Sequence, residues 1–293
     1  MSRSVLRCLA AAVLSVALGA SAHAADLTIG LSTPVTSLDP HFHNLTPNNS
    51  LNRHIFETLI KQDESQRMQP GLAESWKALN DLEWEVKLRK GIKFHNGQEF
   101  TADDVIATFK RVPNVPNSPA SFAFFVRPIV EISAPDKHTL RMKTDKPHPL
   151  LPNDLGAIMI LPKAVAETAK TEDFNSGKAM IGTGAYRLTE YVAGDRVVLK
   201  RNDAYWGTKP TWDNVRFKMI PSAPARVAAL LAGDVQMIEG VPTADIAKLS
   251  KDGRVDLSSA VSNRIIYLHM DSAREKKSPF VTDPAGKPLD ANP

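Results

Sequence analysis

The sequence predicts a mixed α/β fold, and three local patterns carry that prediction. Residues 82–88 (LEWEVKL) alternate strictly between apolar and charged side chains, which is typical of a half-buried strand. Residues 101–109 begin with Thr101 and place Asp104 three positions later, which is the pattern of a capped helix. Strands and helices then follow one another without a regular βαβ alternation, which favours a mixed architecture.

The other elements come from the same reading of periodicity and turn residues. Gly233 is placed to end a helix, and Gly182 and Gly184 are expected to allow a tight crossover between domains, because glycine adopts backbone angles closed to other residues. The expected elements are a strand at 26–31, an amphipathic helix at 49–60, hairpins at 129–142 and 186–199, a helix at 224–231, a strand at 235–238 and a helix at 242–249.

Residues 1–24 are predicted to be a cleavable signal peptide rather than part of the fold. A basic start precedes an apolar run at 9–18, which is too short to span a bilayer, and a small-x-small pattern allows cleavage after Ala24 or Ala25. The single cysteine, Cys8, lies inside this segment. The mature chain would therefore contain no thiol, which excludes cysteine nucleophiles, disulfides and Cys-ligated zinc.

The charge balance argues against a polyanionic partner. The chain has 36 Lys and Arg residues against 32 Asp and Glu residues, a formal net charge of +4. Arg3 and Arg7 belong to the predicted signal peptide, so the mature balance is 34 to 32, or +2. Such a surface gives no support to nucleic-acid or membrane binding.

No constellation for catalysis stands out. There is no P-loop, HExxH or GxSxG motif, and no spacing of Ser, His and Asp singles out a triad. We expect no catalytic residue, no cofactor and no metal site. His41 and His43 could bind Ni²⁺ or Zn²⁺, but we interpret them as loop histidines on opposite sides of an extended segment. Asp103 and Asp104 are explained more simply by helix capping than by acid–base chemistry.

An aromatic cluster follows a proline-rich loop at 113–119. Phe122, Phe124 and Phe125 could line a ligand pocket, because aromatic rings supply flat apolar contact area. They could equally be ordinary core residues. Both interpretations remain open at this point.

Seven motifs follow one another along most of the predicted mature chain. They are SLDP at 37–40, IFETL at 55–59, PGLAESW at 70–76, WEVKLRKGIKFHNGQEFTADDV at 84–105, IGTGAY at 181–186, LKRNDAYWG at 199–207 and AALLAGDV at 228–235. In this order they resemble the family 5 extracellular solute-binding proteins, the group that contains the dipeptide-, oligopeptide- and nickel-binding proteins of ABC importers.

This resemblance implies a periplasmic-binding-protein-like fold of the class II type, with two lobes that close around a cleft by hinge motion. The first lobe would contain one subdomain at 25–60 and 182–270 and another at 61–181. Residues 271–293 would form a linker to a second lobe that is missing, so we expect the chain to be a C-terminally truncated fragment.

The resemblance also implies a function without catalysis. The expected role is capture of a peptide or similar small solute in the periplasm by a monomer that delivers it to the transmembrane subunits of an ABC permease. Alternatives are a nickel or metal-chelate binder, an opine or sugar binder and, less favoured, a periplasmic hydrolase. The ligand contacts that the resemblance implies in this chain are Pro34, Val35, Thr36 and Ser37, with Phe122 and Phe124 bordering the same cleft.

Overall fold

The computed structural model describes residues 25–260, 266–268 and 282–287. One compact unit ends at Leu257, and residues from Ser258 onward form a second. No helix among the described residues is long and apolar enough to cross a membrane. The predicted signal peptide and most of the predicted linker at 271–293 lie outside the described residues.

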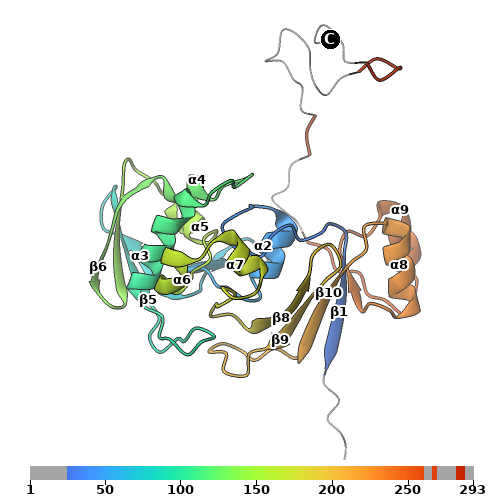
Figure 1. The fold of residues 1–293 in the computed structure, drawn as a ribbon, viewed down its shortest axis with the longest axis horizontal. Helices are drawn as coiled ribbons and strands as arrows, with labels where there is room; N and C mark the ends of the chain where they lie inside the picture. The colour runs from blue at the N-terminus through green and yellow to red at the C-terminus, as the bar shows by residue number, and fades with distance from the viewer. Residues whose placement is uncertain (1–24, 261–265, 269–281, 288–293) are drawn as a thin grey trace, which may run out of the picture. The chain divides into compact units, whose positions relative to one another are not determined.

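The first unit mixes strands and short helices, as expected (Figure 1). The strands are β1 (Asp26–Leu31), β2 (Ile60–Gln62), β3 (Met68–Pro70), β4 (Ala73–Ala78), β5 (Glu83–Leu88), β6 (Ile129–Asp136), β7 (Thr139–Thr144), β8 (Tyr186–Val192), β9 (Arg196–Arg201), β10 (Asn214–Met219) and β11 (Met237–Ile238). The helices are α2 (Thr46–Asn52), α3 (Ala102–Arg111), the 3₁₀ turn η1 (Val112–Asn114), α4 (Ala123–Val126), α5 (Leu151–Leu155), α6 (Lys163–Thr168), α7 (Thr171–Asn175), α8 (Ala223–Ala232) and α9 (Thr243–Leu249).

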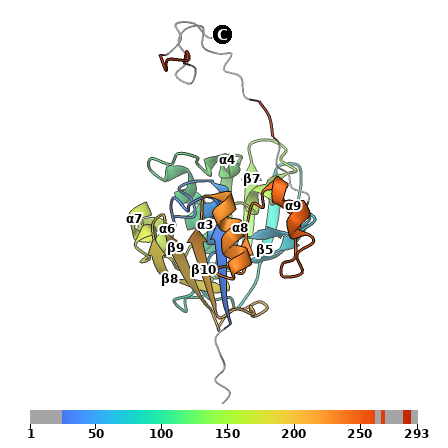
Figure 2. The ribbon, with the colours of Figure 1, turned by 90° about the vertical axis from the view of Figure 1, so that its right-hand side faces the viewer.

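The larger sheet has the strand order β11-β1-β10-β9-β8 within the described residues. Strand β1 runs parallel to both of its neighbours, pairing Ile29 with Phe217 of β10 and with Met237 of β11. Strands β8 to β10 are joined by antiparallel pairing. Figure 2 shows α8 in front of this sheet, and α8 connects β10 to β11. The connection skips over β1, which therefore lies between two strands distant from it in sequence.

The smaller sheet has the order β4-β5-β7-β6, and all of its pairings are antiparallel. It lies with α3 and α4 on the left in Figure 1. The alternation that predicted β5 is confirmed on its apolar side, where Val86 and Leu88 are buried. On the charged side Glu85 is also largely covered, and it forms ion pairs with Lys77 and Arg141 of the neighbouring strands.

Each sheet contributes to its own apolar core. The core of the smaller sheet includes Val86, Leu88, Phe100, Val105 and Leu140. The core of the larger sheet includes Leu38, Phe56, Phe174, Val197 and Phe217. Aromatic and branched aliphatic side chains of this size are the residues whose burial contributes most to the hydrophobic free energy of folding.

The chain crosses between the two cores at residues 53–60, and here the helix expected at 49–60 is wrong in its second half. Helix α2 ends at Asn52, and the segment from Ile55 to Ile60 is buried throughout. Leu51, Ile55 and Leu59 have helical spacing, but Leu51 and Ile55 are buried in the core of the larger sheet, whereas Leu59 is buried in that of the smaller sheet, and only Leu51 lies in a helix. Periodicity alone does not distinguish these two cases.

Gly182 and Gly184 lie against this crossover for a reason other than the predicted one. Neither has a positive φ. A Cβ at Gly182 would lie 1.9 Å from the carbonyl oxygen of Ile55, and one at Gly184 would lie 2.6 Å from the same atom. The N–H of Gly184 donates to that oxygen at 2.9 Å. Glycine is therefore required by close backbone approach rather than by its backbone angles.

The buried carboxylate of Glu57 stabilises the crossover at residues 53–60 through four hydrogen bonds. It accepts hydrogen bonds from Lys61 Nζ (2.8 Å), Thr183 Oγ1 (2.9 Å), the Tyr205 hydroxyl (2.8 Å) and Trp206 Nε1 (2.6 Å). A buried charge is tolerated when it is paired and its oxygens are hydrogen-bonded. The aromatic pair at 205–206 therefore has a structural role, because it satisfies Glu57.

The capping role of Asp104 is confirmed and extended. Asp104 Oδ2 accepts the N–H (2.8 Å) and the hydroxyl (3.1 Å) of Thr101, and Oδ1 accepts the N–H of Lys163 (2.7 Å). One side chain thus caps α3 and links it to the start of α6. Burial raises the pKa of Asp104 above its usual range, despite these hydrogen bonds.

We expect Asp104→Ala to lower the free energy of unfolding by about 2 kcal/mol, because it removes a cap and also the partly buried hydrogen bond to the N–H of Lys163. Urea unfolding at neutral pH measures this change. Asp103→Ala is the matched control, since the Asp103 side chain is exposed and contacts Lys163 only at 3.4 Å. Equal effects of the two substitutions would contradict the role given to Asp104.

Candidate functional site

The parallel strands of the larger sheet define a candidate ligand edge. Strands β10, β1 and β11 run in the same direction, so their carboxyl ends meet at one edge, where β1 lies at a crossover point. In open α/β sheets, ligands bind outside the carboxyl ends of the strands at such points. The loops that leave this edge begin at Ser32, Ile220 and Glu239.

The loop after β1 contains the four residues that the family resemblance implied as ligand contacts, and the structure separates them into two pairs. Pro34 and Thr36 are exposed, whereas Val35 and Ser37 are buried. Within the described residues the carbonyl oxygens of Pro34 and Thr36 accept no hydrogen bond. The exposed pair therefore offers backbone acceptors, and the buried pair anchors the loop.

The anchoring contacts come from three different elements. Asn48 of α2 accepts the N–H of Thr36 at 2.9 Å and donates to its hydroxyl at 2.9 Å. The hydroxyl of Tyr191 in β8 donates to the carbonyl of Val35 at 3.3 Å. Asn175 Oδ1, at the end of α7, accepts the N–H of Leu38 at 2.9 Å. A loop held in this way loses little conformational entropy when it binds a ligand.

In the aromatic cluster at 122–125, one phenylalanine is a core residue and another is exposed to solvent. Phe122 is 1 % exposed and packs against His41, with ring centroids 6.2 Å apart, so it is a core residue. Phe124 is 72 % exposed on α4 and stacks edge-on against Phe125 at 5.7 Å. Of the two phenylalanines implied as ligand contacts, only Phe124 presents its ring to solvent.

The segment before Phe122 runs beside the loop after β1. His43 bridges to Ala120 in parallel register, and the N–H of Asn44 donates to the carbonyl of Ala120 at 2.9 Å. His43 Nδ1 lies 3.0 Å from Thr36 Oγ1. The structure thus places Ala120 next to the segment that contains Thr36 and His43, although Ala120 lies far from both in the sequence.

His41 belongs to a buried network that leaves its ring no room for a metal. Its Nε2–H donates to the carbonyl of Met159 at 2.8 Å, and its Nδ1 accepts from Arg111 Nη1 at 2.9 Å. His43 faces Thr36 instead, so the two histidines do not converge. No group of three His, Cys, Asp or Glu side chains among the described residues is arranged to hold a metal ion.

The same network contains a buried ion pair. Arg111 donates to Asp39 Oδ1 at 3.0 Å and to Oδ2 at 2.7 Å, and Oδ2 also accepts the hydroxyl of Thr171 at 2.8 Å. Burial alone would raise the pKa of Asp39, but the hydrogen bonds and charge of Arg111 outweigh it and lower this pKa. Burial, followed by the Arg111 charge, lowers the pKa of His41 to about 4. His41 is therefore neutral at physiological pH.

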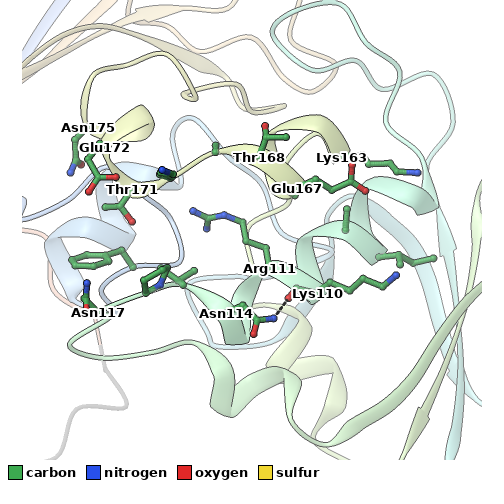
Figure 3. Close-up of a pocket in the computed structure, with 18 of the residues that line it drawn as sticks. Lys110, Arg111, Asn114, Asn117, Lys163, Glu167, Thr168, Thr171, Glu172 and Asn175 are labelled. Carbon is green, nitrogen blue, oxygen red and sulfur yellow. Dashed lines mark hydrogen bonds between the residues drawn. The ribbon is translucent and has the colours of Figure 1, made fainter.

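A pocket of about 900 Å³ lies on the other side of this network, between α3, η1, α6 and α7 (Figure 3). Arg111 points into its centre, with Lys110 and Asn114 on one side and Thr168 and Thr171 on the other. Asn175 lines the pocket and also holds Leu38, so the pocket and the loop after β1 share a wall. No sequence pattern indicated this pocket, because it forms between helices that are short and distant in sequence. Only the basic pair at the end of α3 could have drawn attention to it.

The comparisons with known proteins come from sequence and from structure. The family model of bacterial extracellular solute-binding proteins, family 5 Middle, matches residues 67–285. The oligopeptide-binding protein AppA of Bacillus subtilis is 28 % identical over 85 % of this chain and 47 % of its own length. The periplasmic murein peptide-binding protein MppA of Escherichia coli is 30 % identical over 74 % of this chain and 43 % of its own length. The chain thus spans about half the length of the curated relatives it matches.

Solved structures agree with the sequence match. Escherichia coli MppA superposes with a TM-score of 0.71 at 29 % identity, covering 80 % of this chain and 49 % of MppA. Bacillus subtilis AppA in complex with a nonapeptide gives 0.70 at 29 % identity, covering 77 % and 46 %. AgaA from A. tumefaciens in complex with agropinic acid gives 0.71 at 28 % identity, covering 78 % and 46 %. The fold is therefore of the periplasmic-binding-protein type, and the chain belongs to the family 5 bacterial extracellular solute-binding proteins.

Proposed function

We propose that this protein captures peptides or similar small solutes in the periplasm and delivers them to the membrane subunits of an ABC importer. The observation that carries the proposal is the anchored loop at the carboxyl edge of β1, whose exposed residues Pro34 and Thr36 offer free backbone carbonyls. An extended peptide can pair its N–H groups with such acceptors, and pairing of this kind does not depend on side-chain identity.

Membership of a solute-binding family supports a role without chemistry. Among the relatives, MppA is named as a murein peptide-binding protein, and AppA was solved in complex with a nonapeptide. Binding would exclude water from the ligand, and the anchored loop would limit the entropy lost on binding. On this proposal the protein binds a peptide and releases it intact.

Three further expectations belong to the same proposal. Residues 1–24 act as the signal peptide that directs export. Residues 25–60 with 182–270, and residues 61–181, form the two subdomains of a first lobe, and residues 271–293 form a linker to a second lobe. The protein acts as a monomer, and the membrane permease is its partner.

A second candidate ligand is a small organic acid. AgaA, which was solved with agropinic acid, matches this chain as well as the peptide-binding proteins do, with a TM-score of 0.71. The motifs that carry the resemblance contain residues such as Glu57 and Asp104, which hold the crossover and cap a helix and do not determine the choice of ligand.

Isothermal titration calorimetry with trialanine tests the proposal. We expect one-to-one binding, with no cleavage product after prolonged incubation. A trialanine with N-methylated peptide nitrogens is the matched control, since it lacks the N–H donors. Its affinity should be about five- to tenfold lower for each hydrogen bond lost. Turnover of the peptide, or equal binding of both peptides, would overturn this reading of the loop.

A further inference from the structure

The carboxyl edge of β1 and β11 carries one acidic side chain that reaches between the two strands. Glu239 directly follows β11, and its N–H donates to the carbonyl of Gly30 in β1 at 3.3 Å. Its Oε1 accepts both the N–H (3.2 Å) and the hydroxyl (3.0 Å) of Ser32, the first residue after β1. The carboxylate therefore lies at the start of the loop that contains Pro34 and Thr36.

The backbone beneath this carboxylate is fixed by a buried arginine. Arg226 of α8 is 3 % exposed. It donates from Nε to the carbonyl of Glu239 (3.0 Å), from Nη2 to that of Gly240 (2.9 Å), and from Nη1 to those of Ile220 (2.8 Å) and Pro221 (3.2 Å). One guanidinium thus holds the loops after β10 and β11 together through their carbonyls. The position of Glu239 is set before any ligand arrives.

The second carboxylate oxygen of Glu239 has no partner in the part of the chain that the structure describes. Among the described residues Oε2 accepts no hydrogen bond, and Glu239 forms no ion pair with a Lys, Arg or His side chain. Arg226 contacts the loop through carbonyl oxygens rather than through the carboxylate. Glu239 is only partly exposed, so a charge-assisted hydrogen bond to it is screened less than one at an open surface.

The surroundings of Glu239 favour one kind of ligand group. Two and four residues after Ser32 in the same loop, the exposed residues Pro34 and Thr36 offer carbonyl oxygens, which are acceptors like the carboxylate itself. An edge of acceptors with one negative charge complements a group that carries several N–H donors and a positive charge. An ammonium or guanidinium group fits this description.

We propose that Glu239 determines specificity by binding a positively charged group of the solute. This inference rests on the proposed function, because it concerns the same ligand edge. In a peptide the charge could be the α-ammonium group or the side chain of Lys or Arg, and the chemistry of recognition is shared. Ser32 acts as a positioning residue, because it holds one carboxylate oxygen and leaves the other to the ligand.

The test is calorimetric titration of the protein and its Glu239→Gln variant with four peptides: Ala-Lys-Ala, Ala-Leu-Ala and the N-acetylated form of each. Glu64→Gln is the control for net charge, since Glu64 is exposed in the turn between β2 and β3. We expect Glu239→Gln to lower the affinity for the peptides that carry the recognised positive charge about tenfold or more. The control should change none of the four affinities.

The pattern of losses identifies the source of the charge. If Glu239→Gln lowers the affinity for both peptides with a free N-terminus but not for their acetylated forms, the charge that Glu239 binds is the α-ammonium group. If Glu239→Gln lowers the affinity for both lysine peptides, acetylated or not, the charge that Glu239 binds is the lysine side chain. Ser32→Ala keeps the negative charge of Glu239 and should lower the affinity for the same peptides about two- to threefold. This variant tests the inference if Glu239→Gln fails to fold.

Two negative results are distinguishable. If the unaltered protein binds the peptides and Glu239→Gln keeps their relative affinities, Glu239 does not determine specificity and this inference fails alone. If the unaltered protein binds none of the four peptides, the proposed peptide-binding function itself fails.

Discussion

Replacing Arg111 with methionine should lower the free energy of unfolding by about 3–5 kcal/mol, one of the largest effects expected of any single substitution in this chain. The side chain of Asp39 is fully buried and that of Arg111 is 8 % exposed. Without the guanidinium, the Asp39 carboxylate would remain buried with no opposite charge beside it. Urea unfolding followed by circular dichroism measures the change, provided that the unfolding transition is two-state.

The double substitution Arg111→Met with Asp39→Asn is the matched control. It removes both charges, so we expect it to be less destabilised than Arg111→Met alone. Arg111 also lies over the ring of Phe174, 4.8 Å from its centroid, and methionine keeps part of that apolar contact. A double variant as unstable as the single one would show that packing, rather than charge, dominates at this site.

The second large effect is a loss of stability in mild acid that depends on His41. Its pKa in the folded protein is lowered from 6.5 to about 4, so folding favours the neutral ring. Above pH 6.5 this stabilisation is complete. As the pH falls from 6.5 towards 4, the unfolded chain takes up a proton that the folded chain does not. The free energy of unfolding should fall by up to about 3 kcal/mol over this range.

His41→Gln provides the comparison, because the glutamine amide can still donate to the carbonyl of Met159 and does not titrate. Unfolding curves of both proteins between pH 7 and pH 4 should converge as the pH falls, since only the unaltered protein loses the histidine contribution. The neighbouring charges of Asp39 and Arg111 are present in both proteins. Parallel pH profiles would show that His41 does not titrate in this way.

Local elements of the fold were predictable because their causes are local. The alternation at 82–88 predicted β5, Thr101 with Asp104 predicted the start of α3, and Gly233 predicted the end of α8. Gly233 has a φ of +83°, a conformation that glycine adopts without strain. Each of these signals lies within a few residues of the structure it determines.

Features that depend on distant segments were not predictable in the same way. Helix α2 ends at Asn52, and the residues just after it pack against Gly182 and Gly184, more than a hundred residues away. Phe122 is buried against His41, whereas Phe124, two positions later, is exposed. Periodicity reports which residues are apolar, but only the tertiary structure determines which surfaces cover them.

The candidate site shows the same division. The resemblance to a family implied ligand contacts at Pro34, Val35, Thr36 and Ser37, and the structure shows that two of these residues are exposed and two are buried. The bond between Ser32 and Glu239 joins residues 207 positions apart, and no sequence pattern indicated it. Pairing of β1 with β11 brings these residues together, and that pairing emerges only from the order of strands in the sheet.

Native mass spectrometry of the protein isolated from its own cells would test peptide binding most directly. A binding protein that closes on its ligand should retain it through gentle purification. We predict a complex whose additional mass is a few hundred daltons and whose released ligand fragments into amino-acid masses. A retained ligand that yields no amino-acid fragments would contradict the account and favour the organic-acid alternative.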